Sequence, residues 1–145
     1  MLGGIGDSPF TLFCRYPLEI EKNVSYIVHM TYGTHVRKVR ERRRQEDRSY
    51  SLRQVAIRIG VEPAYLSKIE RDQVAPPSEA KTRRLAAELG EDPDVLLAMS
   101  GKVSTDLKDI ILKRPTLFAD LIRELKDMPD HAILRIARDV RDGDW

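Results

Sequence analysis

Two short amphipathic segments joined at one glycine constrain this chain more than any other feature. They occupy residues 51–70, SLRQVAIRIGVEPAYLSKIE. In the first segment apolar residues recur at i, i+3, i+4 and i+7, which places them on one face of a helix. Gly60 can end that helix because a left-handed backbone costs glycine nothing, and Pro63 fits the first turn of the next helix. The pattern predicts two short helices joined by a tight turn.

Helix-start signals recur around this pair and define a larger helical region. Each N-cap candidate carries a side-chain oxygen that can accept a hydrogen bond from the first turn. No alternating β-branched run of strand length occurs between residues 31 and 101. The sequence therefore predicts an all-α, five-helix domain at residues 31–101, with a first helix at 32–44 and N-caps at Ser51, Ser78 and Asp92. The residues expected to face its core are Val36, Val39, Leu52, Val55, Ala56, Ile59, Val61, Leu66, Ile69, Leu85, Ala86, Leu89, Val95, Leu96 and Met99.

The two ends of the chain differ in character from this domain. Residues 1–30 contain the turn-rich stretch LGGIGDSP and are interpreted as an N-terminal extension that is either not native or disordered. Residues 102–145 contain three amphipathic patterns, which predict a C-terminal helical segment for dimerisation or regulation. A segment this short leaves part of its apolar stripe without an intramolecular partner, so we expect a second subunit to cover it. The expected helices are 104–113, 116–126 and 129–141.

Charge is distributed unevenly, although the formal net charge is only +2. Residues 31–90 carry 14 Lys and Arg against 8 Asp and Glu, whereas residues 91–145 carry 9 against 12. A basic middle region is typical of an anion-binding face, and equally of a solvated charged surface. No apolar run approaches the ~20 residues of a membrane span, and the N-terminus lacks a secretory signal pattern. The single cysteine, Cys14, cannot form an internal disulfide, which fits a reducing compartment. Together these features predict a cytoplasmic protein without a membrane partner.

A set of residues in the paired helices and at their exit forms one joint pattern: Gln54, Val55, Ala56, Gly60, Val61, Leu66, Ser67, Lys68, Ile69, Glu70, Pro76 and Pro77. Ala56 lets the two helices approach closely, and Gly60 takes the backbone conformation of the turn. The pattern resembles the helix-turn-helix of the XRE (Cro/phage-repressor-like) family over residues 31–99. The resemblance implies a lambda-repressor-like fold and a transcriptional regulator, a repressor rather than an activator, that binds double-stranded DNA as a homodimer on an inverted repeat. Its recognition helix, near residues 63–71, would enter a major groove ~12 Å wide, with the second subunit's helix ~34 Å away.

The resemblance also implies which side chains contact DNA. The outward face of the recognition helix supplies the base-reading candidates Pro63, Ala64, Ser67 and Lys68. Lys68 can donate to guanine O6 and N7, and Ala64 can meet a thymine methyl group. Phosphate contacts are expected at the start of the preceding helix, whereas Tyr65 either binds a phosphate or packs. The full set of DNA-binding candidates is Arg40, Arg43, Arg53, Gln54, Pro63, Ala64, Tyr65, Ser67, Lys68 and Arg71.

The link between the first and second helices departs from the family pattern. In this family an arginine of the first helix commonly pairs with the glutamate that ends the recognition helix, which here implies Arg40 and Glu70. The link RRRQEDRSY is several residues longer than usual, so Arg43 and Arg44 are alternatives to Arg40. The extra Arg48 either contacts the DNA backbone or minor groove, or lies in a solvated loop.

Two other classes of protein compete with a DNA-binding regulator. An enzyme is disfavoured because no glycine-rich phosphate loop exists, and because His29 and His35 lie near no acidic or cysteine cluster of metal-ligand spacing and are expected at the surface. We therefore expect no catalytic site, no metal and no cofactor. The alternative is an antitoxin or adaptor whose C-terminal helices capture a partner protein, with Trp145 either at a binding hot spot or packed back on the helices.

Overall fold

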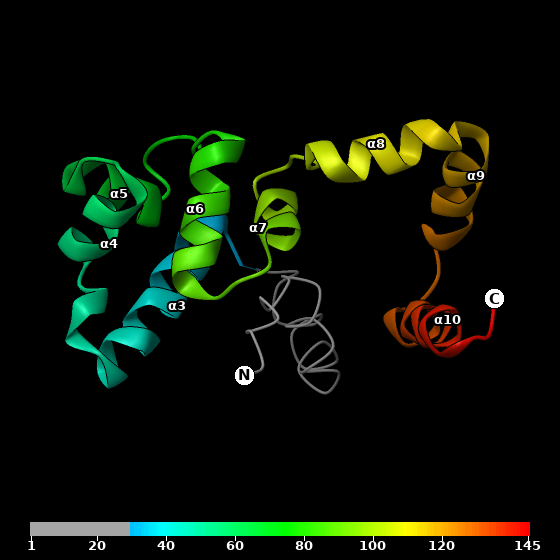
Figure 1. The fold of residues 1–145 in the computed structure, drawn as a ribbon, viewed down its shortest axis with the longest axis horizontal. Coiled ribbons are helices and arrows are strands. Elements are labelled where there is room, and N and C mark those ends of the chain that lie inside the picture. The colour runs from blue at the N-terminus through cyan, green and yellow to red at the C-terminus, as the bar shows by residue number, and fades with distance from the viewer. Residues whose placement is uncertain (1–29) are drawn as a thin grey trace, which may run out of the picture. The chain divides into compact units, whose positions relative to one another are not determined.

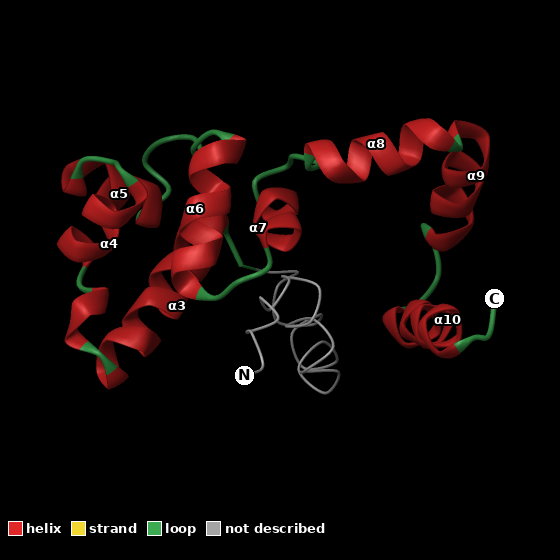
Figure 2. Cartoon of the chain, viewed as in Figure 1, coloured by secondary structure: helices red, strands yellow, loops and turns green. Residues whose placement is uncertain are grey.

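The computed structural model describes residues 30–145, and all their regular structure is helical. Predictions about the N-terminal extension, Cys14 and His29 lie outside these residues. The prediction of an all-α fold is confirmed, since the described residues form eight α-helices, one 3-10 helix and no strand (Figure 2). In chain order the elements are α3 Tyr32–Glu46, η1 Arg48–Tyr50, α4 Leu52–Ile59, α5 Pro63–Glu70, α6 Glu79–Leu89, α7 Pro93–Met99, α8 Thr105–Lys113, α9 Pro115–Leu125 and α10 Asp130–Asp142 (Figure 1).

The described residues divide into two compact units. Residues 30–107, called here the five-helix unit, form the first, and residues 108–145, the C-terminal unit, belong to the second. In the five-helix unit α5 packs against α3 and α4, while α6 packs against α4 and α7. These helices, cyan to green in Figure 1, enclose one apolar core. The buried apolar residues are Tyr32, Val36, Val39, Val55, Ala56, Ile59, Leu66, Ile69, Leu85, Ala86, Leu89, Leu96 and Leu97.

Core membership differs from the prediction at α3 and α7. Leu97 is fully buried, whereas Val95, expected to face the core, is only half-buried, because the short α7 turns a different side inward. The Tyr32 ring joins the core at the start of α3. Burial raises the pKa of the Tyr32 hydroxyl, which lies 3.5 Å from Thr82 Oγ1. The apolar stripe of α3 is therefore wider than the two valines that define it in the sequence.

The helix ends follow the predicted signals closely. Ser51 Oγ accepts a hydrogen bond from the Gln54 backbone N–H at 3.3 Å, and Gly60 ends α4 with a left-handed φ of 72°. Ser78 and Asp92 cap α6 and α7 in the same way as Ser51 caps α4. A polar side chain at each N-cap satisfies an N–H group that has no partner inside the helix.

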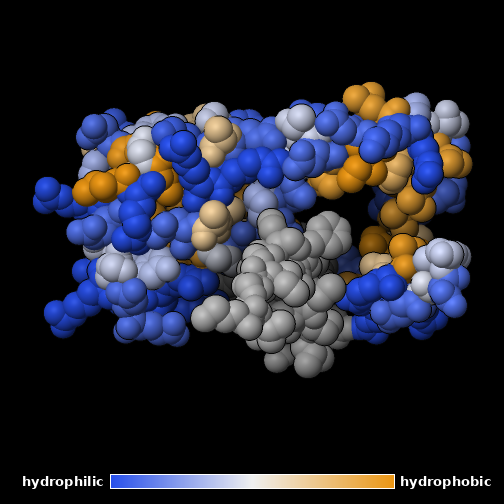
Figure 3. Space-filling model, in the orientation of Figure 1, coloured by the Kyte–Doolittle hydropathy of each residue, from blue (hydrophilic) through white to orange (hydrophobic). Residues whose placement is uncertain are grey.

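The C-terminal unit consists of short helices that bury little. In the part of the chain that the structure describes, α8, α9 and α10 contain no buried residue. Trp145 is 93% exposed, and its indole Nε1 donates to the Val140 backbone oxygen at 2.9 Å. Figure 3 shows apolar side chains at the surface of these helices. The large apolar residues exposed on them or beside them are Val103, Leu107, Ile110, Leu112, Leu117, Leu121, Ile122, Val140 and Trp145.

Candidate nucleic-acid interface

The helices α4 and α5 form a pair whose turn is held from two sides. Within the turn, the Val61 N–H donates to the Ala56 backbone oxygen at 2.9 Å. From α6, Lys81 Nζ donates to the backbone oxygens of Ile59 at 3.3 Å and Gly60 at 2.7 Å. These carbonyl groups lie at a helix end, where no partner exists within the helix. The angle between α4 and α5 is therefore fixed by the turn itself and by a neighbouring helix.

The outward face of α5 is exposed while its inward face is buried. Leu66 and Ile69 lie in the core, whereas Ala64, Tyr65 and Lys68 lie on the exposed side. Tyr65 is 36% exposed, so part of this residue is accessible to a ligand. Within residues 30–145, the Lys68 ammonium group forms no hydrogen bond or ion pair. This face can therefore present donors and a methyl group to a ligand without unfolding the pair.

The remaining candidates on α5 form a local cluster. Pro63 and Ser67 are half-buried, and Arg71 follows the helix as an exposed residue. Arg71 donates from its guanidinium to both the backbone oxygen and the hydroxyl of Ser67, each at 3.1 Å. The guanidinium of Arg71 is thereby held at the C-terminal end of the exposed face.

The first turn of α4 places two further candidates at the surface. Arg53 and Gln54 are both exposed. The Arg53 guanidinium makes no hydrogen bond or ion pair with any other residue that the structure describes. The N-terminus of a helix carries a positive dipole end, and together with an arginine it favours a phosphate group.

The predicted pair of Arg40 and Glu70 is present, which decides between Arg40, Arg43 and Arg44. Arg40 Nε lies 2.6 Å from Glu70 Oε1, and a terminal guanidinium nitrogen lies 2.8 Å from Oε2. The same guanidinium donates to the Tyr50 backbone oxygen at 3.4 Å. Because Arg40 and Glu70 are each only 5% exposed, the pair joins α3 to α5 inside the unit.

Arg43 also has intramolecular partners. Its Nε donates to the Leu89 backbone oxygen at 2.6 Å, at the end of α6. Its guanidinium lies 5.7 Å from the centre of the Tyr50 ring, and that of Arg58 lies 5.3 Å from the same ring. DNA contacts by Arg40 and Arg43 stay predictions, and both guanidinium groups hold helices together in this structure.

Asp72 forms a clasp between the start of α3 and the end of α5 that the sequence pattern does not predict. Asp72 has a left-handed φ of 54°, and its carboxylate accepts from the Gly33 N–H at 2.9 Å and the Thr31 hydroxyl at 2.6 Å. A side chain at Gly33 would collide with the Ile69 backbone oxygen and with Asp72. The available signal in the sequence is a glycine in the first turn of a helix. Glycine lowers helix propensity, so its presence there indicates that another backbone approaches closely.

The prediction that His35 lies at the surface is wrong. His35 is 7% exposed and shares the inward face of α3 with Val36 and Val39. Its Nε2 lies 3.0 Å from Glu91 Oε2, so the carboxylate gives the buried ring a polar partner. Within residues 30–145, no group of His, Cys, Asp and Glu side chains is placed to hold a metal ion.

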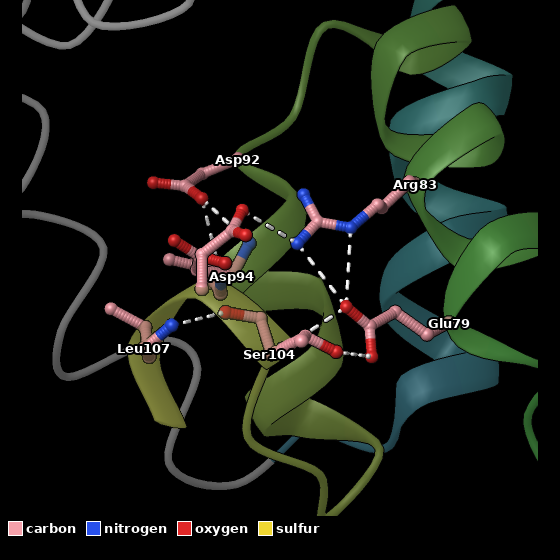
Figure 4. A network of polar contacts seen from close by, with 9 residues as sticks. Glu79, Arg83, Asp92, Asp94, Ser104 and Leu107 are labelled. Atoms are coloured by element: carbon pink, nitrogen blue, oxygen red, sulfur yellow. Dashed lines mark hydrogen bonds and ion pairs between the residues drawn. The ribbon is translucent and has the colours of Figure 1, made fainter. Parts of the chain in front are cut away.

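A polar network fixes the start of α8 to α6 within the five-helix unit (Figure 4). Glu79 accepts from the backbone N–H of Thr105 at 3.1 Å and from its hydroxyl at 3.0 Å. Arg83 donates to Glu79 at 3.2 Å and to Asp106 at 3.0 Å. Ser104 is fully buried and accepts from the backbone N–H of Leu107 at 3.2 Å, capping α8.

The comparison with known families agrees with this geometry. Residues 32–99, which span α3 to α7, match a family described as "Helix-turn-helix domain". No curated protein and no solved structure matches the chain. The chain therefore contains a helix-turn-helix domain, in which α4 and α5 are the paired helices, followed by further C-terminal helices. None of the helices between residues 30 and 145 is long and apolar enough to cross a membrane.

Proposed function

We propose that this chain is a sequence-specific, double-stranded-DNA-binding transcriptional regulator of the XRE family. The observation that carries the proposal is the exposed face of α5, which is fixed on its inner side and bears Ala64, Tyr65 and Lys68. In helix-turn-helix proteins the second helix of the pair lies in the major groove, and its side chains contact base edges. Helix-turn-helix regulators typically have no enzymatic activity, and we infer no catalytic role, metal or cofactor for this one.

Each exposed candidate has a role in this proposal. Lys68 donates to a guanine, and Ala64 contacts a thymine methyl group. Arg53 and Gln54 bind phosphates at the start of α4, where the helix dipole favours them. The other members of the face contact phosphates or fit the shape of the groove. They are Pro63, Tyr65, Ser67 and Arg71.

Arg40 and Arg43 have an indirect role in the same proposal. Their guanidinium groups bind Glu70 and the Leu89 carbonyl, so they position α5 and α6 rather than reach a base. A direct contact of Arg40 with DNA would break its buried ion pair and leave the Glu70 charge buried without a partner, which is costly.

We propose further that the regulator is a homodimer and represses transcription by covering a promoter. The exposed apolar faces of α9 and α10 support dimerisation, because helices of 11 and 13 residues are marginal in water unless they are packed. A two-fold dimer would place two copies of α5 in successive major grooves of an inverted repeat. A second candidate function, an antitoxin or adaptor, uses the same apolar faces to bind a different protein.

Analytical ultracentrifugation separates these two uses of the C-terminal helices. Leu121→Asp and Ile122→Asp each place a charge on α9 at a residue that is about half exposed, 47% and 55%. We expect both variants to sediment as monomers while the wild type sediments as a dimer. A dimer that survives both substitutions would remove α9 from the interface, and a monomeric wild type would favour the adaptor.

The DNA-binding proposal is tested by fluorescence anisotropy on duplexes selected from a random-sequence library. Lys68→Ala should weaken binding to the selected sequence by about 1–3 kcal/mol and relax the preference at one base pair. The matched control is Lys113→Ala, which removes the same charge from an exposed residue of α8. If no sequence is enriched, or if both variants bind the selected duplex equally well, the proposal that α5 recognises a specific sequence is wrong.

A further inference from the structure

The link between α3 and α4 carries exposed positive charge on an ordered piece of backbone. Arg44 lies near the end of α3, Arg48 begins η1, and both are exposed. The stretch from residue 42 to residue 53 contains five arginines and two acidic residues, Glu46 and Asp47. The proposed function uses only Arg53 from this stretch as a phosphate contact.

Several contacts hold the backbone of this link in place. Asp47 Oδ1 accepts from the Ser49 N–H at 2.8 Å and so caps η1. The Tyr50 carbonyl accepts from Arg40, and the Tyr50 ring is approached by the guanidinium groups of Arg43 and Arg58. The link is therefore attached to α3, to α4 and to the buried ion pair, so its backbone loses little freedom when an arginine on it binds a ligand.

Two acidic residues near this link already have hydrogen-bond or ion-pair partners. The hydrogen bond from the Ser49 N–H lowers the pKa of Asp47, so this carboxylate is ionised and accepts a hydrogen bond within its own loop. Glu41 lies in the field of Arg44 but pairs with Arg37 at 2.9 Å. The Arg48 guanidinium forms no hydrogen bond or ion pair with any residue from 30 to 145. Five arginines against two carboxylates leave positive charge in excess along residues 42–53, with Glu46 and Asp47 as the exposed counter-charges.

We propose that Arg44 and Arg48 form a second phosphate-binding surface, which contacts the DNA backbone beside the start of α4. This inference rests on the proposed function. The first helix of a helix-turn-helix crosses the DNA backbone when the second lies in the major groove. The link leads directly into α4, the first helix of the pair. The backbone N–H of Ser51, the N-cap of α4, donates to the Arg48 carbonyl at 3.2 Å. The added contacts bind any sequence and extend the footprint along the backbone.

The test is the salt dependence of DNA binding by Arg44→Ala and Arg48→Ala. Each variant should reduce the slope of log K against log salt by about 0.9, and weaken binding about eight-fold at about 0.1 M salt, because one fewer counterion is released. Selected and unrelated duplexes should be affected equally, since phosphates carry no sequence information. Arg48→Lys should keep the wild-type slope, and Arg123→Ala in the C-terminal unit is the control for loss of one exposed charge.

The possible outcomes separate this inference from the function beneath it. Unchanged slopes in both alanine variants, with Lys68→Ala still weakening specific binding, would overturn the second phosphate surface and leave the proposed function intact. A loss confined to the selected duplex would show that these arginines read bases, which also contradicts the inference. No binding of any duplex by the wild type would overturn the proposed function itself. Each variant must give the same circular dichroism spectrum as the wild type. If Arg48→Ala does not, Arg48→Lys shows whether the fold tolerates a change at this residue.

Discussion

The five-helix unit and the C-terminal unit are built from helices of similar length, yet their helices are stabilised differently. α4 and α5 have 8 residues each, and each buries three of them. α9 and α10 have 11 and 13 residues and bury none, although both are strongly amphipathic. Isolated helices this short are marginal in water, so packing decides whether they persist. The five-helix unit therefore supplies its own core, whereas the helices of the C-terminal unit present apolar faces that the proposed second copy would cover.

The largest effect is expected from removing half of the buried ion pair in the five-helix unit. Arg40→Met leaves the Glu70 charge buried without a partner and should lower the free energy of unfolding by about 3–5 kcal/mol. The double variant with Glu70→Leu should lose much less, because no charge stays buried. Urea unfolding followed by circular dichroism measures both.

The matched control for this prediction lies in the C-terminal unit. Arg123→Met breaks an ion pair with Asp120 whose side chains are 73% and 65% exposed, and it should change stability by less than about 1 kcal/mol. Equal losses from Arg40→Met and Arg123→Met would contradict the distinction between the two units.

A leucine truncation in each unit gives the next largest contrast. Leu66 is fully buried, and Leu66→Ala should lower the free energy of unfolding by about 2–5 kcal/mol through lost contacts and a cavity. Leu117 is 67% exposed, and Leu117→Ala should change it by about 0.5 kcal/mol or less when measured below the dimerisation concentration. A large loss from Leu117→Ala in the monomer would show that the C-terminal helices have a packed core of their own.

A methyl group at Gly33 should have an intermediate effect. Its Cβ would meet the Ile69 carbonyl, so Gly33→Ala should force α3 and α5 apart at a cost of about 1–3 kcal/mol. At Gly101 nothing lies within 4 Å of the added carbon, and Gly101→Ala should cost about 1–2 kcal/mol, which is the penalty for its left-handed φ of 76° alone. Amide chemical shifts of Asp72 should move in the first variant and stay fixed in the second. Unchanged Asp72 chemical shifts in Gly33→Ala would show that the clasp does not hold α3 against α5.

The sequence predicted the local structure of the five-helix unit well because its signals are local. Ser51, Gly60 and Asp92 define helix ends through their own backbone and side-chain chemistry, and the structure confirms each of them. Gly33 with Asp72, and His35 with Glu91, were missed because each pair joins residues that are far apart in the sequence. Periodicity identifies the inward face of a helix, but it does not identify which polar side chain meets that face. The Arg40–Glu70 pair was predicted only through the family resemblance, for the same reason.

The smallest effect is expected at the start of α8, where the five-helix unit ends. The backbone N–H of Thr105, with help from its hydroxyl and from Arg83, lowers the pKa of Glu79 below its ordinary value of 4.5. A carboxyl whose pKa is lowered by folding stabilises the folded state above its unfolded pKa, and this contribution is lost as the pH falls through the folded value. The amide resonance of Thr105 should therefore titrate with a midpoint below 4.5, and Glu79→Gln should abolish this titration.

Glu41 provides the control for this titration. Its pKa is also lowered, by Arg37, but it lies on α3, so Glu41→Gln should leave the Thr105 titration unchanged. A Thr105 midpoint at or above 4.5 would show that Glu79 does not hold the start of α8. The expected result would place the first turn of α8 chemically within the five-helix unit, because Glu79 and Arg83 both come from α6. The boundary between the two units, after Leu107, would then lie inside α8, just beyond the residues that contact α6.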